Sequence, residues 1–358
     1  MYCARVSSCL SFTHIQVIAY YKLLKQAPAG VTTFMAIPSV LKGKLRLPLI
    51  GSPLFIISTP ELVFAQCTSG IVGSFPSLNA RPLDILDKWL TELTQKLEAF
   101  QAEHPDRIVA PFAVNLICHH SNNRLYDDVD LCVKHKVPVI ITSLRAPADV
   151  VEKIHSYGGI VLHDVTNIRH AKKAISEGVD GLILVCAGAG GHAGTLSPFA
   201  LVSEIREFYD GCVVLSGSMS TGSSILSAQA LGADLAYMGT RFIATQEACA
   251  NPDYKKMLVD STADDIVYTN LFTGIHGNYL KPSIVNSGMD PDQLKESDKS
   301  KMNFGSGGNS DAKVWKDIWG SGQGIGSIKD SPSASDLINR LYDEYQQAKF
   351  SLQQNYHF

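Results

Sequence analysis

Short apolar segments alternate with longer amphipathic segments along most of the chain, from residue 47 to about residue 245. Runs rich in β-branched residues are typical of strands, and apolar positions three and four residues apart are typical of helices. The pattern predicts eight strands, at residues 47–51, 71–75, 109–115, 137–143, 159–164, 181–186, 213–216 and 235–238.

Seven helices are predicted between these strands, at residues 60–68, 83–103, 126–135, 147–157, 167–177, 198–209 and 221–231. Strand-helix alternation implies parallel strands joined by right-handed crossovers, because each helix must bury its apolar stripe on the sheet. Eight repeats are enough to close a (β/α)8 barrel, the TIM barrel of the α/β class. An open doubly wound sheet is the alternative, although it usually has only about five or six strands.

The pattern changes after residue 245. We expect residues 249–330 to form a helical and loop insertion after strand eight, lying over the active site. Helices are expected near residues 251–257 and 262–264, and glycine-rich loops at 303–308 and 321–326. A closing helix at 333–350 completes the barrel, which we assign to residues 35–248 together with 331–358. Residues 1–34 are expected to be an N-terminal extension outside the fold.

Composition excludes several classes of partner. The net charge is -3 and no block of like charges occurs, so nothing favours binding to nucleic acid or to a membrane surface. The eight cysteines include no CxxC pair, which is typical of free thiols in a reducing compartment. We therefore expect a cytoplasmic protein with a small-molecule partner.

A glycine-rich loop after predicted strand six contains the first candidate for chemistry. Four glycines and His192 lie in the stretch AGAGGHAGT, which begins at Ala187. Residues that follow barrel strands meet at one face, where such enzymes place their active sites. An imidazole with a pKa of about 6.5 can take a proton from a carbon acid or bind an anion, so His192 is the catalytic candidate. A purely structural histidine is the alternative.

Two further loops suit a phosphate group. LSGSMSTG (215–222) and YMGTRF (237–242) follow predicted strands seven and eight, where backbone N-H groups at the start of two helices can hold an anion. Tight turns alone would also explain these glycines. Arg241 either adds positive charge to this site or forms an ion pair elsewhere.

Adjacent His119 and His120 do not share a face, so no metal site is predicted. Cys186 is expected to be a buried thiol.

Taken in order, these three loops resemble the nitronate monooxygenase family, formerly called 2-nitropropane dioxygenases, whose members are FMN-dependent barrels. The resemblance covers about residues 36–350. It implies FMN as cofactor and His192 as catalytic base or substrate-orienting group. It also implies that Pro53 and Leu54 line the flavin ring and that Asn115, Gly190 and Gly191 contact FMN. The residues implied to hold the phosphate are Gly217, Ser218, Met238, Gly239 and Thr240.

The chain departs from the family pattern at two positions. Val185 stands where many relatives have a glutamine, and Asp164 stands where many have a lysine near the flavin. Since a lysine there would stabilise a reduced anionic flavin, its absence leaves the redox poise open. His163 is the candidate replacement.

The resemblance implies oxidation of a nitronate or nitroalkane by dioxygen to a carbonyl compound and nitrite. An FMN-dependent NAD(P)H:quinone or enoyl reductase is the alternative from the same superfamily, and a flavin-binding module without turnover is the alternative of another class. The physiological substrate and the oligomeric state, including a homodimer, stay open. Tyr268, Phe272, His276 and Tyr279 are expected either to cover the flavin or to pack in a core.

Overall fold

The computed structural model describes residues 36–145, 147–297 and 317–355. The chain divides into two units, Met1–Phe34 and Met35–Phe358, and only the second is described below. The predicted extension at residues 1–34 and the predicted glycine-rich loop at 303–308 lie outside the described residues.

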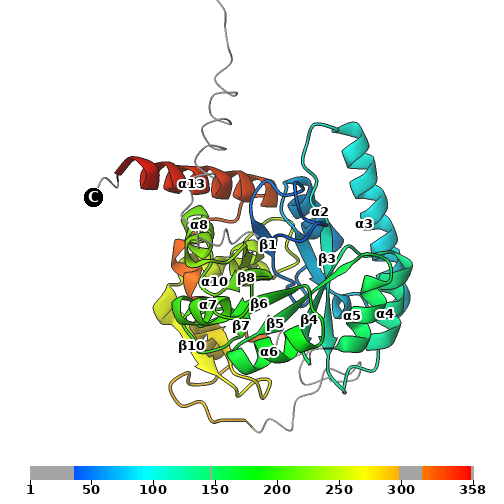
Figure 1. Ribbon diagram of the computed structural model, residues 1–358. Helices are drawn as coiled ribbons and strands as arrows, with labels where there is room; N and C mark the ends of the chain where they lie inside the picture. Colours follow the sequence, from blue (N-terminus) through cyan, green and yellow to red (C-terminus); the bar gives the residue numbers. More distant parts are fainter. Residues whose placement is uncertain (1–35, 146, 298–316, 356–358) are drawn as a thin grey trace, which may run out of the picture. The chain divides into compact units, whose positions relative to one another are not determined.

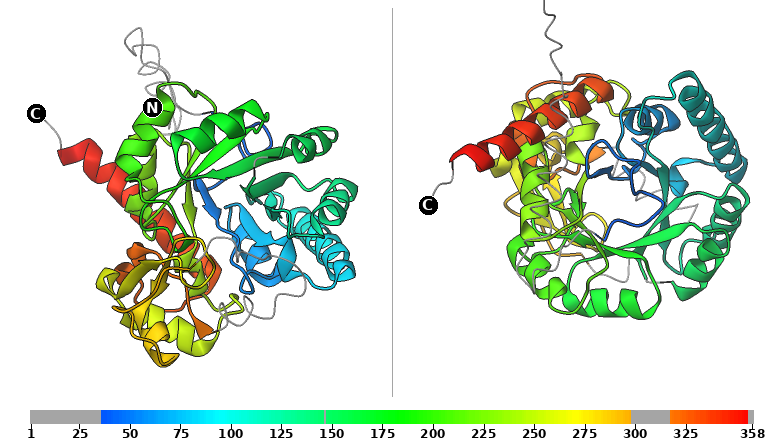
Figure 2. Two further views of the ribbon diagram at one scale, coloured as in Figure 1. Left: turned by 90° about the horizontal axis from the view of Figure 1, so that it is seen from below. Right: turned by 45° about the horizontal axis from the view of Figure 1, so that its top comes forward.

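Eight parallel strands form a closed ring (Figures 1 and 2). The hydrogen-bonded order is β1-β9-β8-β6-β5-β4-β3-β2, and the ring closes where the N-H of Gly51 in β1 donates to the carbonyl of Val72 at 2.8 Å, just before β2. The predicted (β/α)8 barrel is confirmed. Its strands are β1 (Leu49–Gly51), β2 (Gly73–Pro76), β3 (Phe112–Cys118), β4 (Val139–Leu144), β5 (Ile160–Val165), β6 (Gly181–Val185), β8 (Cys212–Ser216) and β9 (Leu235–Met238).

The third strand differs most from its prediction, because it begins and ends three residues later. Pro111 lacks an N-H group and cannot donate to a sheet ladder, so regular pairing starts only at Phe112. Pairing with β4 then continues as far as Cys118, which lies opposite Leu144.

Seven helices follow the predicted order around the ring, and an eighth comes from the end of the chain. Strand β9 is followed by only one helical turn, α9 (Thr240–Ile243), whereas the long helix α13 (Ala334–Asn355) packs against both α8 and α2. The other helices are α2 (Pro60–Thr68), α3 (Leu83–Glu103), α4 (Leu125–Lys134), α5 (Ala148–His155), α6 (Ile168–Ser176), α7 (Pro198–Arg206) and α8 (Gly222–Leu231).

The segment between α9 and α13 contains helices near the expected positions and, in addition, strands that the sequence did not predict. It contains α10 (Pro252–Asp260) and α11 (Lys281–Asn286), but also strands β10 (Ile266–Thr269) and β11 (Gly277–Leu280). These pair antiparallel, and β11 also pairs with β7 (Gly191–His192) in the glycine-rich loop. The third strand is distant in the sequence, so no local pattern indicates this sheet.

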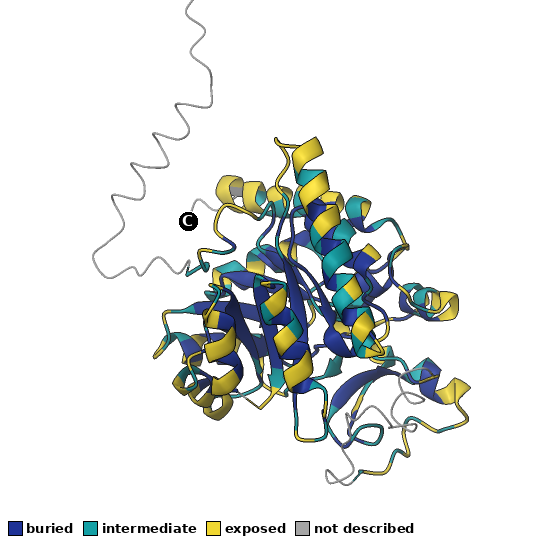
Figure 3. Cartoon of the chain, turned by 90° about the vertical axis from the view of Figure 1, so that its right-hand side faces the viewer, coloured by how far each residue is buried: buried dark blue, intermediate teal, exposed yellow. Residues whose placement is uncertain are grey.

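The strands are mostly buried, whereas the helices have exposed outer faces (Figure 3). Alternating side chains of the strands divide the core into two layers. One set, including Ile50, Ile141 and Leu162, fills the barrel interior, while the alternate set, including Leu116 and Met238, packs under the helices. Strands buried on both faces therefore read as continuous apolar runs.

A turn before β1 closes the end of the barrel opposite the strand C-termini. Leu41 is fully buried and belongs to the interior cluster. The backbone N-H of Ala36 donates to Asp234 Oδ1 at 2.8 Å, immediately before β9 begins, which anchors the turn at this end. The turn therefore closes the barrel interior at the N-terminal ends of the strands.

We predict that Leu41→Ala lowers the free energy of unfolding by about 3 kcal/mol, because the truncated side chain leaves a cavity in a closed core. Urea denaturation measures this loss. Lys42→Ala changes an exposed neighbour in the same turn and should alter stability by less than about 0.5 kcal/mol. Equal effects of the two substitutions would show that the turn does not plug the barrel.

Candidate active site

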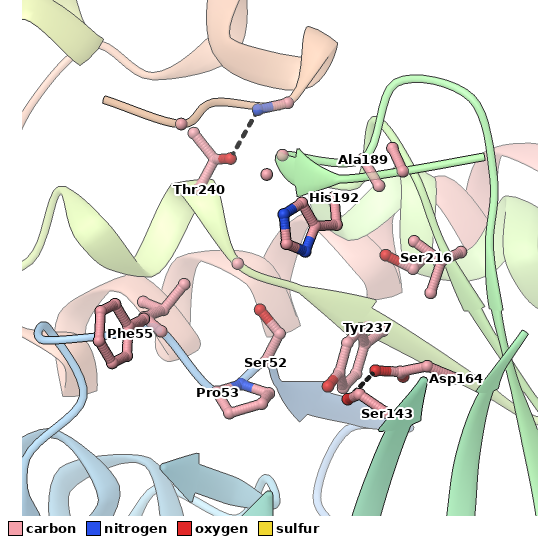
Figure 4. A pocket seen from close by; sticks show the side chains of 18 of the residues that line it. Ser52, Pro53, Phe55, Ser143, Asp164, Ala189, His192, Ser216, Tyr237 and Thr240 are labelled. Carbon is pink, nitrogen blue, oxygen red and sulfur yellow. Dashed lines mark hydrogen bonds between the residues drawn. The ribbon is translucent and has the colours of Figure 1, made fainter. Parts of the chain in front are cut away.

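A cavity of about 700 Å³ lies at the C-terminal ends of the barrel strands (Figure 4). Its size is within the usual range for small-molecule and cofactor sites, about 300–1,000 Å³. Residues near or just after the strand ends line it, among them Ser52, Ser143, Asp164 and Thr240, together with Asn115 from the middle of β3. The predicted face of the barrel is therefore the hollow one.

Most of the predicted site residues are brought together in this cavity. The lining includes His192 and nine of the predicted cofactor contacts: Pro53, Leu54, Asn115, Gly190, Gly191, Gly217, Ser218, Gly239 and Thr240. Whether they contact a cofactor stays a prediction.

Met238 and His163 do not line the cavity, so side-chain contacts from them to a cofactor there are not supported. Met238 is fully buried between the strands and the helices. His163 is 2% exposed, and its Nδ1 lies 2.7 Å from Thr142 Oγ1. Because side chains alternate along a strand, the neighbouring residues Asp164 and Tyr237 face the cavity instead.

Glycines in the loop after β6 permit close contact between backbones. Gly188 and Gly191 have φ values of 81° and 66°, in the left-handed region that favours glycine. A Cβ at Gly190 would lie 2.8 Å from the backbone nitrogen of Gly322, too close for any other residue without a shift. The glycine density therefore reflects both backbone conformation and the approach of another loop.

The approaching loop, residues 320–324, overlaps the predicted glycine-rich loop at 321–326, but its contact with the loop after β6 was not predicted. The N-H of Gly322 donates to Thr240 Oγ1 at 2.9 Å, and the N-H of Gln323 donates to the carbonyl of Gly188 at 2.9 Å. Gly320, Gly322 and Gly324 line the cavity. Their alternation was a visible signal, but nothing local linked it to the loop after β6.

One of the two predicted anion-binding helix starts is already satisfied by the protein. At the start of α8, the N-H of Gly222 donates to Glu344 Oε2 at 2.7 Å, and the N-H of Thr221 donates to Ser224 Oγ at 3.1 Å. That helix terminus is therefore not open to a phosphate. Gly217 and Ser218 before α8, with Gly239 and Thr240 at α9, are the lining residues left for this role.

His192 is held in place by strand pairing and by one hydroxyl group. It lies opposite Gly277 of β11, and its Nε2 is 2.8 Å from Thr273 Oγ1. The Thr273 hydroxyl is also 3.1 Å from the carbonyl of Ile275. When it donates there, it accepts from an N-H at Nε2, and the imidazole lone pair then lies on Nδ1. Burial lowers the pKa of His192 to about 4, so the ring is neutral near pH 7.

A polar chain crosses the opposite side of the cavity. Asn115 Nδ2 donates to Ser143 Oγ at 2.9 Å, and Ser143 Oγ donates to Asp164 Oδ2 at 2.6 Å. Burial raises the pKa of Asp164 to about 6, against the opposing effect of the Ser143 hydrogen bond. Figure 4 shows the Tyr237 ring beside these two groups. The sequence placed Ser143 and Asp164 at this rim but gave no sign of their bond.

The four aromatic candidates for a cover separate into two pairs. Tyr268 stacks on His276 with ring centroids 5.1 Å apart, and its hydroxyl donates to the carbonyl of Ala193 at 2.8 Å. His276 lines the cavity. Phe272 and Tyr279 instead pack edge to face at 5.0 Å in a small core of the insertion. Of the four, His276 reaches the cavity, and Phe272 and Tyr279 pack in the core as the alternative expected.

The remaining sequence candidates contribute no chemistry to the cavity. Arg241 is 2% exposed and pairs with Asp330 at 3.0 Å. Burial raises the pKa of the Cys186 thiol to about 12, so it is not a nucleophile near neutral pH. Within the described ranges, no group of three or more metal-ligating side chains occurs. A search of those same ranges also finds no helix of the length and apolarity needed to span a membrane.

We predict that Gly190→Ala lowers the free energy of unfolding by about 1–3 kcal/mol, because the added methyl group forces residues 188–190 away from the backbone of residue 322. Gly326→Ala, two residues beyond the loop 320–324, is the matched control, since a Cβ there meets nothing within 4 Å. Urea denaturation and limited proteolysis of residues 317–330 measure the difference. If both variants behave like the parent protein, the two loops are not in backbone contact.

Comparison with known proteins gives the family. The family model described as nitronate monooxygenase matches residues 74–344, which is more than half of the chain. A probable nitronate monooxygenase from Bacillus subtilis is 24% identical over 352 residues, covering 87% of this chain and 98% of that protein.

Two further likenesses involve other named activities. The (3aS,4S,5R,7aS)-5-hydroxy-7a-methyl-1-oxo-octahydro-1H-indene-4-carboxyl-CoA dehydrogenase of Rhodococcus jostii is 28% identical over 240 residues. That match covers 67% of this chain but only 64% of the relative, which is less than two thirds of its length. The solved structure of nitroalkane oxidase from Streptomyces ansochromogenes has a TM-score of 0.71 at 21% identity, covering 87% of this chain and all of that one, and shows the shared fold. Since the family model spans most of the barrel and the cavity residues, this chain belongs to the nitronate monooxygenase family and is an oxidoreductase.

Proposed function

We propose that the protein uses FMN to oxidise an alkyl nitronate, or the corresponding nitroalkane, with dioxygen to a carbonyl compound and nitrite. The observation that carries this proposal is a neutral, positioned histidine that lines a cavity with a glycine-rich end and a polar opposite end. His192, Gly239 and Asn115 mark these three parts of the site.

The residues of the cavity fit FMN. Gly190 and Gly322 leave no room for a side chain, so backbone groups form this wall, and a planar phosphorylated ligand can approach it closely. Hydroxyl and backbone groups of Ser218 and Thr240 would hold the phosphate, while Pro53 and Leu54 would pack against the ring. Bound FMN supplies the electron transfer to dioxygen.

His192 handles the proton in this proposal. Its Nδ1 is the basic atom, because Nε2 donates to Thr273. With the pKa of the ring at about 4, removal of a proton from a neutral nitroalkane is uphill, whereas a nitronate needs no deprotonation. A bound nitronate anion raises the pKa of the imidazole, and a proton on Nδ1 then faces the nitronate oxygens. Nitronates are therefore the preferred substrates.

We predict that His192→Asn keeps the FMN absorption of the purified protein but lowers turnover of propionate-3-nitronate by about a hundredfold or more. Nitrite release and the visible spectrum measure the two properties. His104→Asn, at an exposed position after α3, is the control and should match the parent enzyme. Undiminished nitrite release by His192→Asn would remove this residue from the mechanism.

Reduction of a quinone or an enoyl substrate by NAD(P)H is the second candidate, because the Rhodococcus relative is named as a dehydrogenase of a CoA ester. Anaerobic addition of NADH separates the two functions. We expect NADH to bleach the flavin slowly and a nitronate to bleach it rapidly. Rapid bleaching by NADH would favour the reductase, and a yellow protein inert to nitronates, quinones and NAD(P)H would favour a binding module without turnover.

A further inference from the structure

One polar atom of the cavity has no role in the function proposed above. Asp164 lines the cavity from the end of β5, and its Oδ1 is buried without a hydrogen-bond partner among the described residues. A buried polar atom without a partner is costly, and native proteins rarely keep one unless a ligand or water satisfies it. The arrangement therefore indicates a ligand contact at Oδ1.

We propose that Asp164 binds the cofactor as a neutral acid, donating a hydrogen bond from Oδ1 to a carbonyl oxygen on the pyrimidine edge of the flavin. This inference rests on the proposed function, because it takes FMN as the ligand. It assigns Asp164 the role of a cofactor-binding residue.

The orientation of the carboxyl group is fixed by its neighbours. Ser143 donates to Oδ2 at 2.6 Å and itself accepts from Asn115 at 2.9 Å, so the three side chains form one directed chain from β3 to β5. With Oδ2 engaged, the second oxygen is the one left for a ligand in the cavity. A hydrogen bond from Ser143 does not require Asp164 to be charged, because a carbonyl oxygen accepts equally.

The surroundings of Asp164 favour its neutral form. Its neighbours Ser143, Asn115 and Tyr237 carry no positive charge, and burial raises the pKa of the carboxyl group to about 6. The other titratable or charged groups that line the cavity are His192 of β7, His170 of α6, Tyr254 of α10, His276 before β11 and Arg81 before α3. Burial lowers the pKa of His192 and of His170, which opposes a compensating charge on either ring. A bound flavin would exclude more water and raise the pKa of Asp164 further.

The position of Asp164 suits the pyrimidine part of the flavin. The candidate phosphate residues follow β8 and β9, whereas Asp164 and Asn115 belong to β5 and β3 on the other side of the ring order. A ligand with its phosphate at the first pair of strands extends its ring toward the second. The pyrimidine ring carries two carbonyl oxygens, and these accept from a carboxylic acid but are repelled by a carboxylate.

The test compares FMN affinity at two pH values, using flavin fluorescence quenching with the parent enzyme and Asp164→Asn. The amide is isosteric and never charged. At pH 5 the acid is protonated, and we predict that the two proteins have similar dissociation constants for FMN. At pH 8 the parent must take up a proton to bind, so we predict that Asp164→Asn binds FMN at least roughly tenfold more tightly than the parent. Titration of the FMN phosphate is common to both proteins and cancels in their ratio. Asp149→Asn, which removes an outer carboxylate bonded to Tyr126, should follow the parent at both pH values.

Thermal unfolding without FMN checks the premise and the folding of the variant. The folded-state pKa of Asp164 is raised, so its ionisation destabilises the parent as pH rises from about 4 through about 6. Asp164→Asn should therefore melt at a higher temperature than the parent at pH 8 and at a similar temperature at pH 4.

Three outcomes would overturn the inference. An affinity ratio that is the same at pH 5 and pH 8 would show that Asp164 does not bind as an acid. Weaker binding by Asp164→Asn at pH 8 would show that the carboxylate is the binding form. A melting temperature of Asp164→Asn below that of the parent at pH 8 would remove the premise of a raised pKa. Failure of the parent enzyme to bind FMN at either pH would instead refute the proposed function, so the two failures are distinguishable.

Discussion

Direct contact between the backbones of residues 188–190 and 322–323 holds the catalytic face together. Hydrogen bonds join Gln323 to Gly188 and Gly322 to Thr240, and a methyl group at Gly190 would break this contact. Asn278 extends the same junction by donating to the carbonyl of Ala189 at 2.7 Å. Because β11 contains Asn278 and also pairs with His192, the position of the candidate base depends on the contact between these loops.

The order of elements along the chain explains how a long insertion lies at the mouth of the barrel without interrupting the ring of strands. The insertion follows α9, and the helix that completes the outer layer, α13, comes after it. Asp330 connects these parts, since it accepts from Arg241 Nη2 at 3.0 Å and from Arg340 Nη2 at 2.7 Å. Both ends of the insertion are thus fixed to the barrel, and its β10–β11 hairpin extends the rim at His192.

Desolvation acts on titratable groups on both sides of the cavity. Burial lowers the pKa of His192 and raises that of Asp164, so both groups are shifted toward their neutral forms. Such a site suits a large, mostly uncharged ring. The charge of an anionic substrate would be stabilised mainly by fixed dipoles and by a proton taken up from solvent. The same desolvation makes His192 a weaker base, so removal of a proton from a neutral carbon acid becomes less favourable, in line with the nitronate substrate proposed above.

The sequence by itself determined the eight strands, the seven helices between them and the rim positions from Ser52 to Thr240, because these follow from local periodicity and from the parallel order of the strands. It did not determine that Met238 and His163 face the helices, since a shift of one residue in a short apolar strand exchanges its two faces. Only the tertiary structure decided the sheet that joins His192 to β11, the contact between Gly190 and Gly322, and the burial that raises the pKa of Asp164. Pairing between distant segments and burial from water are properties of the folded chain, and no local pattern carries them.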